Sequence, residues 1–134
     1  HLNGSCTVTT RLLIVEDQQD IRNLIRATLE FEDFEIHEAE DGRGGLDKYQ
    51  AVRPAVVLLD VMMPGEFDGL QVCQRIRKDP HGARTRIILL TARGQKSDIE
   101  LGTAAGADAY LVKPFSPLEL IETIENLIET SPAA

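Results

Sequence analysis

Four short apolar runs, each followed directly by a polar residue, constrain the fold of this chain more than any other feature. The runs span residues 12–15, 56–59, 87–90 and 110–112, and the residues after them are Glu16 and Asp17, Asp60, Thr91 and Lys113. Continuous apolar runs of this length are typical of strands that are buried on both faces of a parallel sheet. Because parallel strands end along one edge of their sheet, we expect these polar side chains to lie close together.

Helical periodicity fills the first interval between these runs. Apolar residues at spacings of three and four predict a helix over residues 20–31, with one buried face made of Ile21, Leu24, Ile25, Thr28 and Leu29. A short run at 35–39 reads as a strand, and its charges place it near an edge of the sheet.

Four more helices complete the pattern. Three are expected from Gly42 to near Val52, from Asp68-Gly69 to the breaker segment 79–82, and over 96–105. The last begins where Ser116, Pro117 and Glu119 combine an N-cap serine, a first-turn proline and a capping-box glutamate. Its buried face is predicted to contain Leu120, Ile121, Ile124, Leu127 and Ile128.

Five strands alternating with five helices predict an α/β fold, a doubly wound parallel sheet with right-handed crossovers and helices on both faces. A chain of 134 residues with 43% hydrophobic content has room for one compact domain, expected over residues 10–130. The opening segment is polar and lacks an initiating Met, so we expect residues 1–9 to be disordered or artificial. Residues 131–134 are expected to form a C-terminal tail.

The charge balance narrows the possible partners. The chain has 14 basic and 22 acidic residues and a net charge of -8, which repels nucleic-acid phosphates and anionic lipid headgroups. We therefore expect no direct nucleic-acid binding and no membrane association, and a basic protein or a cation as partner. No apolar run approaches the ~18 residues of a membrane span. Cys6 and Cys73 fit no metal-ligand spacing, and we expect a reduced, cytoplasmic protein.

Four motifs in order along the chain resemble those of the receiver domain of two-component response regulators. They are Val15-Glu16-Asp17, Leu59-Asp60-Val61-Met62-Met63-Pro64-Gly65, Leu90-Thr91-Ala92 and Lys113-Pro114-Phe115. The resemblance implies a flavodoxin-like (βα)5 fold with strand order 2-1-3-4-5. It also implies that Asp60 is a phosphoacceptor, which takes a phosphoryl group from a phosphohistidine of a histidine kinase or a histidine phosphotransfer protein.

The same resemblance assigns roles to the other residues. It implies Mg²⁺ or another divalent cation as cofactor, with Asp17, Asp60 and the Met62 backbone carbonyl as direct ligands and Glu16 acting through water. Thr91 and Lys113 would contact the phosphoryl oxygens, and Thr91 and Tyr110 would form the switch. The output would be a surface of the fourth helix, fifth strand and fifth helix, read by a downstream protein or a fused effector domain. Lys113-Pro114 is expected to be a cis peptide.

The chemistry of these residues supports that interpretation independently. A carboxylate can act as a nucleophile and form an acyl phosphate if nearby negative charge is neutralised. Glu16 and Asp17 would crowd Asp60, since like charges at about 4 Å cost on the order of 4 kcal/mol at an effective dielectric of about 20. A divalent cation with oxygen ligands, and the ammonium of Lys113, would relieve this repulsion.

Two departures from the family pattern carry expectations of their own. The loop 64–69 is one residue longer than the common form, so Phe67 lies either in solvent against a partner or in ordinary loop packing. Met62 and Arg93, two positions beyond Asp60 and Thr91, cannot orient an attacking water, so we expect slow dephosphorylation. The protein is then no turnover enzyme and catalyses only its own Mg²⁺-dependent phosphorylation and slow dephosphorylation.

Other interpretations remain open from the residues alone. A small acyl-phosphate hydrolase would need a separate general base, and a flavodoxin-like carrier would need a glycine-rich phosphate cradle after the first strand, where Glu-Asp-Gln-Gln stands. A pseudo-receiver that only binds partners is the third alternative. Tyr110 could be plain half-buried core, Glu16 could be solvated and passive, and His37 and His81 are interpreted as surface histidines.

Overall fold

The structure, a computed structural model, describes residues 9–92 and 96–129, and its centre is one parallel sheet. The strands are β1 (Thr10–Val15), β2 (Phe34–Ala39), β3 (Val56–Asp60), β4 (Arg86–Thr91) and β5 (Ala109–Val112). Their order is β2-β1-β3-β4-β5, so the predicted order 2-1-3-4-5 and the edge position of the charged strand are confirmed. The predicted terminal segments, except Thr9, lie outside the described residues, as does Arg93.

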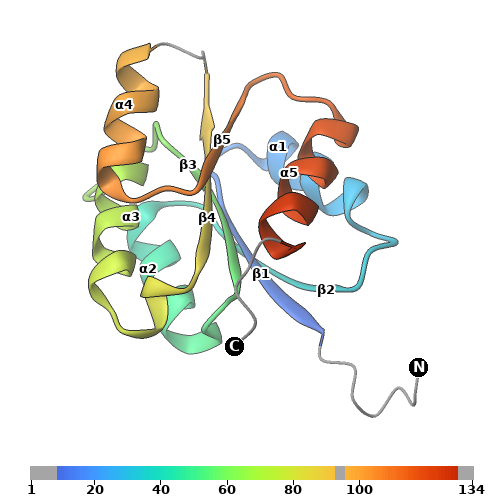
Figure 1. Ribbon diagram of the computed structural model, residues 1–134, viewed down its shortest axis with the longest axis horizontal. Helices are drawn as coiled ribbons and strands as arrows, with labels where there is room; N and C mark the ends of the chain where they lie inside the picture. The colour runs from blue at the N-terminus through green and yellow to red at the C-terminus, as the bar shows by residue number, and fades with distance from the viewer. Residues whose placement is uncertain (1–8, 93–95, 130–134) are drawn as a thin grey trace.

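Helices cover both faces of this sheet (Figure 1). On one face lie α2 (Gly42–Val52), α3 (Gly69–Lys78) and α4 (Lys96–Ala105), and on the other lie α1 (Gln19–Thr28) and α5 (Pro117–Glu129). A short 3-10 helix, η2 (His81–Ala83), precedes β4. Because both faces are covered, every residue of β3 is buried, which explains why that strand is apolar up to Asp60.

Reciprocal capping boxes begin two of the helices where the sequence predicts a start. At α5, the Ser116 N–H donates to Glu119 Oε1 at 3.0 Å and the Glu119 N–H donates to Ser116 Oγ at 3.1 Å. At α3, Asp68 and Gln71 form the same reciprocal arrangement, with both distances 2.9 Å. These bonds satisfy backbone donors that a helix leaves unpaired at its first turn, and they confirm both predicted boundaries.

The first helix differs from the prediction in its end and in its buried face. It ends at Thr28 and not at Phe31, because after the helical bond from the Leu29 N–H to Ile25 the Glu30 N–H bonds back only three residues, to Ala27, and the chain turns toward β2. Leu24, predicted to be buried, is 43% exposed, whereas Arg22 is only 7% exposed. The helix is rotated so that Ile25, Leu29 and the guanidinium of Arg22 face the sheet. At the other end of the chain, Ile128 is also exposed.

The core consists of two apolar clusters separated by the sheet. One lies beneath α2, α3 and α4 and includes Tyr49 and Cys73; the other lies beneath α1 and α5 and includes Ile25 and Leu120. Burial raises the pKa of Cys73 to about 11, so its thiol stays protonated and acts as a small apolar group. Among the described residues, no helix has the length and apolar content needed to span a bilayer.

Candidate functional site

Asp60 is the last residue of β3 and its side chain is buried at the carboxyl edge of the sheet. The residue is 3% exposed, and its Oδ1 accepts a hydrogen bond from the Met62 N–H at 3.2 Å. The start of α3 packs tightly on the same strand end, because a Cβ on Gly69 would lie 2.1 Å from the Asp60 carbonyl oxygen. Glycine at position 69 therefore lets the loop after β3 fold back over the site.

Glu16 follows β1 and is completely buried beside Asp60. Its Oε1 lies 2.8 Å from the Lys113 ammonium, and its Oε2 accepts a hydrogen bond from the Gln18 N–H at 3.1 Å. The Glu16 N–H donates to the Ala39 carbonyl at 3.0 Å, which ties this loop to the end of β2. Glu16 is therefore not solvated, because both carboxylate oxygens have partners inside the fold, and its functional role stays a prediction.

Lys113 brings the positive charge that the sequence predicts at this edge. Its Nζ lies 3.2 Å from Asp60 Oδ1 and 2.8 Å from Glu16 Oε1, and its side chain is 18% exposed. The backbone at Lys113 is fixed by a hydrogen bond from its N–H to the Thr91 carbonyl, and the Lys113-Pro114 peptide is cis, as expected. One ammonium thus bridges two buried carboxylates.

A third carboxylate, from Asp17, completes an acidic cluster. Glu16, Asp17 and Asp60 each place one carboxylate oxygen within 4.8 Å of the other two. Asp17 is exposed, so the cluster opens to solvent on its side. Hard oxygen donors at this spacing suit Mg²⁺, which prefers carboxylates and retains several waters. The residues present therefore fit the cation that the sequence analysis expects.

The pKa values at the site reflect an excess of negative charge. Burial, followed by the charge of Glu16, raises the pKa of Asp60 to about 7, although Lys113 acts in the opposite direction. Burial alone would lower the pKa of Lys113, but its contacts with Glu16 and Asp60 outweigh burial and raise it. Burial tends to raise the pKa of Asp17, but hydrogen bonding with Glu16 and Asp60 lowers it. Three carboxylates thus lie near one ammonium, which contacts Glu16 and Asp60, and the excess of negative charge helps to raise the pKa of Asp60.

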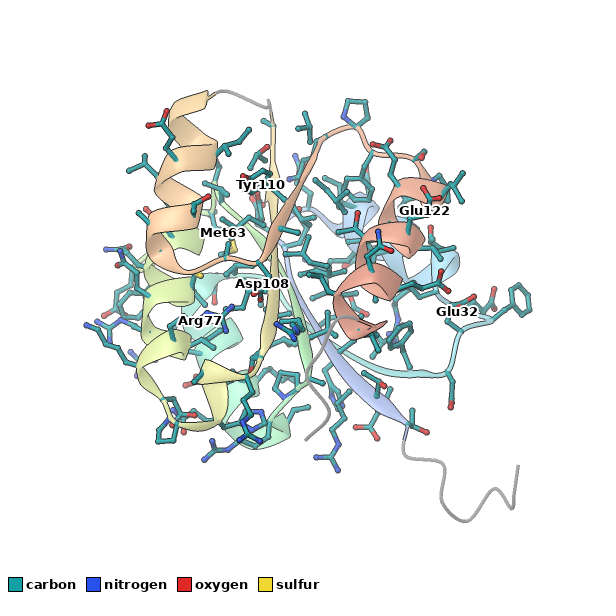
Figure 2. The ribbon with its side chains drawn as sticks, in the orientation of Figure 1. Glu32, Met63, Arg77, Asp108, Tyr110 and Glu122 are labelled. Carbon is teal, nitrogen blue, oxygen red and sulfur yellow. The ribbon has the colours of Figure 1, made fainter. Side chains whose placement is uncertain are left out.

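The two residues predicted to form a switch lie on neighbouring strands. Thr91 is the last residue of β4 and is 2% exposed, with its hydroxyl-bearing side chain at the same edge as Asp60. Tyr110 lies on β5, is half-buried, and packs against the core cluster that includes Met63, as the labelled side chains in Figure 2 indicate. Thr91 therefore lies at the same sheet edge as Asp60, and Tyr110 lies on β5, the strand next to that of Thr91. The switch itself remains a prediction.

Two residues near this edge differ from expectation or settle an open alternative: the buried Arg22, which was not predicted, and Phe67, whose placement was left open. Arg22 donates from Nη1 to the Glu16 carbonyl and from Nε to Glu38 Oε1 at 3.1 Å. Arg22 lies three residues before Ile25, on the helix face that packs on the sheet, but a helical pattern assigns a charged side chain to solvent, so the spacing gave no usable signal. Phe67 is not in solvent: it is half-buried and packs against the core, with the Arg75 guanidinium 4.3 Å from its ring centroid.

Comparison with known proteins identifies relatives of this chain. The family model of the response regulator receiver domain matches residues 12–125. The transcriptional regulatory protein ResD of Bacillus subtilis is 42% identical over 122 residues, which cover 91% of this chain and 49% of ResD. SrrA of Staphylococcus aureus is 40% identical over 121 residues, covering 90% of this chain and 48% of SrrA. The chain therefore spans about half the length of these curated relatives.

Solved structures agree with this assignment. The chemotaxis protein CheY4 of Vibrio cholerae superposes with a TM-score of 0.84 at 32% identity, covering 90% of this chain and 99% of CheY4. The BeF3-activated receiver domain of DrrB superposes with a TM-score of 0.81 at 28% identity, covering 91% of this chain and 99% of that receiver-domain chain. The matched family, the strand order and the acidic edge lead to one conclusion: this chain belongs to the response regulator receiver domain family.

Proposed function

We propose that this domain accepts a phosphoryl group on Asp60 from a phosphohistidine of a sensor histidine kinase or a histidine phosphotransfer protein, in the cytoplasm. One observation carries the proposal. Asp60 lies buried at the end of β3, with the Lys113 ammonium 3.2 Å from its carboxylate and two further carboxylates within 4.8 Å. An aspartate with a purely structural role at a strand end needs neither a buried ammonium nor two further carboxylates beside it. A phosphoacceptor needs both, because the acids hold a metal ion and the ammonium stabilises the incoming phosphoryl group.

The proposed transfer is a displacement at phosphorus. A carboxylate oxygen of Asp60 attacks the phosphorus, the new P–O bond forms as the P–N bond to the imidazole breaks, and the electron pair returns to the leaving nitrogen. Lys113, already 3.2 Å from Asp60, would donate to a phosphoryl oxygen and stabilise the charge that arrives with it. The Thr91 hydroxyl would donate to another phosphoryl oxygen.

Mg²⁺ would be held by Asp17, Asp60 and the Met62 backbone carbonyl, and it would supply the positive charge that lets a dianionic phosphoryl group approach three carboxylates. Glu16 would contribute through water. Its two oxygens already contact Lys113 and the Gln18 N–H, which leaves it less able to bind the ion directly.

The proposed output is a change at the surface made by α4, β5 and α5. Phosphorylation would add a charge of about −1.5 to −2 beside Thr91 and Tyr110, which can shift these side chains and the elements around them. Two features support this surface. The residues of α4 that are buried in its described part are the small Gly102 and Ala105, and apolar side chains at Leu101, Val112 and Leu118 are exposed nearby. A downstream protein or a fused effector domain would read the change.

Phosphorylation with a small donor tests the proposal. With acetyl phosphate and Mg²⁺, the wild-type chain should gain one phosphoryl group, measured by intact-mass spectrometry, and Asp60→Asn should gain none. Asp68→Asn is a matched control because asparagine also serves as a helix N-cap, so it should be labelled like the wild type. Labelling of Asp60→Asn at the wild-type level would exclude Asp60 as the acceptor.

The lifetime of the phosphoryl group is a separate part of the proposal. The Met62 side chain is 74% exposed and has no group that could orient an attacking water, so hydrolysis should be slow. The label remaining over time would be followed after removal of the donor. Faster hydrolysis in Met62→Ala or Arg93→Ala would contradict the view that these residues merely fail to assist water.

A further inference from the structure

Arg22 is the one arginine of α1 that turns inward, and all of its polar contacts lie at the acidic edge. Within the described residues, its Nη1 donates to the Glu16 carbonyl, its Nη2 donates to Gln19 Oε1 at 2.6 Å, and its Nε donates to Glu38 Oε1 at 3.1 Å. The side chain is only 9% exposed. A guanidinium loses much hydration when it is buried to this extent, so a site that keeps one there must supply matching acceptors.

We propose that Arg22 is a positioning residue for the cation site: it fixes the Glu16-Asp17 peptide so that the Asp17 carboxylate faces Asp60. This inference rests on the proposed function, because it concerns the Mg²⁺ site described there. In this role Arg22 would bind neither the phosphoryl group nor the metal ion itself. It acts through the backbone of the loop that carries two of the three acids.

The loop after β1 is held from both sides of one residue. The Glu16 N–H donates to the Ala39 carbonyl at 3.0 Å, and the Glu16 carbonyl accepts from Arg22. That carbonyl belongs to the peptide bond that leads into Asp17, so its orientation sets the direction from which the Asp17 side chain leaves the backbone. Without Arg22 the preceding Val15-Glu16 peptide keeps its hydrogen bond to β2, whereas the Glu16-Asp17 peptide loses the bond from Arg22 that restrains its rotation.

Glu38 connects this arrangement to the edge strand and supplies a matched comparison. Its Oε1 accepts from Arg22 and its Oε2 lies 2.9 Å from Arg26 Nε. The Arg26 side chain is 48% exposed, and within the described residues it makes no hydrogen bond to the Glu16-Asp17 loop. Arg22 and Arg26 therefore share a partner, a helix and a charge, and differ in the contact with the Glu16 carbonyl.

The test is Mg²⁺ affinity, measured by NMR titration in the full chain with the Asp17 amide as the reporter. Residues that orient metal ligands typically change affinity by about 10- to 100-fold when they are replaced, so Arg22→Gln should weaken binding about tenfold or more. Arg26→Gln removes only an exposed ion pair and should stay within about twofold of the wild type. Equal affinities for Arg22→Gln and the wild type, or equal losses in both variants, would overturn the inference.

Two additional measurements separate positioning from general stability. Arg22→Gln is expected to lower the melting temperature, and the titration is therefore run well below it, where circular dichroism shows an intact fold. A merely structural arginine would leave the Mg²⁺ dissociation constant unchanged there. If Arg22→Gln does not fold, Arg22→Lys decides: one ammonium cannot replace three directed donors, so weaker binding is expected and wild-type binding would overturn the inference.

The wild-type titration distinguishes this inference from the proposed function. Wild-type binding together with unchanged binding in Arg22→Gln would overturn only the role of Arg22. Absence of Mg²⁺ binding by the wild type would overturn the proposed cation site, and the role of Arg22 with it.

Discussion

Ionic groups gather at both ends of the sheet, but only at the carboxyl end do acidic groups outnumber the basic groups that contact them. At the amino end of β4 and β5, Arg77 donates to the carbonyls of Gly82 and Gly106, each at 2.7 Å, and to Asp108 Oδ2 at 2.7 Å. Figure 2 shows the labelled Arg77 and Asp108 side chains on this side of the molecule. Asp108 also accepts the Ile87 N–H at 2.8 Å. This network joins α3 to the segments that precede β4 and β5, and the one carboxylate of Asp108 pairs with two arginines, because Arg86 Nη1 also lies 3.8 Å from its Oδ1.

The carboxyl end of the sheet has similar groups, but there the carboxylates outnumber the ammonium group of Lys113. Glu16, Asp17 and Asp60 share Lys113, and the pKa of Asp60 rises to about 7 as a result of burial and the charge of Glu16. The difference shows that buried charge alone does not mark a functional site. What distinguishes this end is a deficit of positive charge that a bound cation can fill.

Removing Arg77 should lower the free energy of unfolding, because this side chain holds together the segments at the amino end of β4 and β5. Arg77→Met leaves the carbonyls of Gly82 and Gly106 without this donor and removes one of the two arginines that pair with Asp108, so we expect a loss of about 2–3 kcal/mol. Urea unfolding should report this loss, while Mg²⁺ affinity stays at the wild-type value. Arg75→Met, two residues away on the same helix, is the control and should lose much less. A normal stability for Arg77→Met would remove the contrast between the two ends.

Removing the Asp60 carboxylate should raise the stability of the metal-free fold, whereas removing Arg77 should lower it. Because the pKa of Asp60 is raised from 3.8 to about 7, its ionised form destabilises the metal-free fold by at most ~4 kcal/mol near neutral pH. Asp60→Asn relieves the repulsion but keeps a polar group buried, so we expect a gain of about 2 kcal/mol near pH 8 with chelator present. Denaturant unfolding would measure it, and a loss of stability would contradict the charge deficit.

The same shift predicts a pH dependence. The folded-state pKa of Asp60 lies above the unfolded value, so the folded protein binds more protons between about pH 4 and pH 7. Stability of the metal-free chain should therefore be highest at the acidic side of this window and fall by about 1.5 kcal/mol from near pH 6 to near pH 8. Asp60→Asn should flatten this profile. If the stability of Asp60→Asn depended on pH as steeply as that of the wild type, the pH dependence would arise from other titratable groups.

Of the four predicted changes in stability, the one caused by Mg²⁺ binding should be the smallest. A ligand that binds only the folded state contributes about 1 kcal/mol at about five times its dissociation constant. Thermal unfolding near pH 8 should show this shift in the wild type and little of it in Asp17→Asn, whereas Asp41→Asn, at the N-cap of α2, should behave like the wild type. Equal shifts in all three proteins would indicate nonspecific cation binding.

Much of the fold and the site was predictable because it depends on short-range patterns. The apolar runs of β3 and β4 and the capping pair Ser116 and Glu119 each carry their structural reason in adjacent residues. Strand ends then place Asp60 and Lys113 together, since a parallel sheet fixes which edge they share.

The rest depends on tertiary contacts that periodicity does not contain. A helical pattern assigns an arginine to solvent, so the burial of Arg22 and the exposure of Leu24 could not be read from spacing. The pairing of Lys113 with Glu16 as well as Asp60 follows from the relative positions of three strands. The early end of α1 at Thr28 depends on how the turn to β2 is made.

A crystal structure of the chain with Mg²⁺ and trifluoroberyllate, an analogue of the phosphoryl group, tests the charge-deficit interpretation most directly. We expect the analogue bonded to an Asp60 carboxylate oxygen, Mg²⁺ bound by Asp17 and Asp60, and Lys113 donating to a fluorine. An analogue bound at another residue, or a cation bound away from these carboxylates, would contradict it.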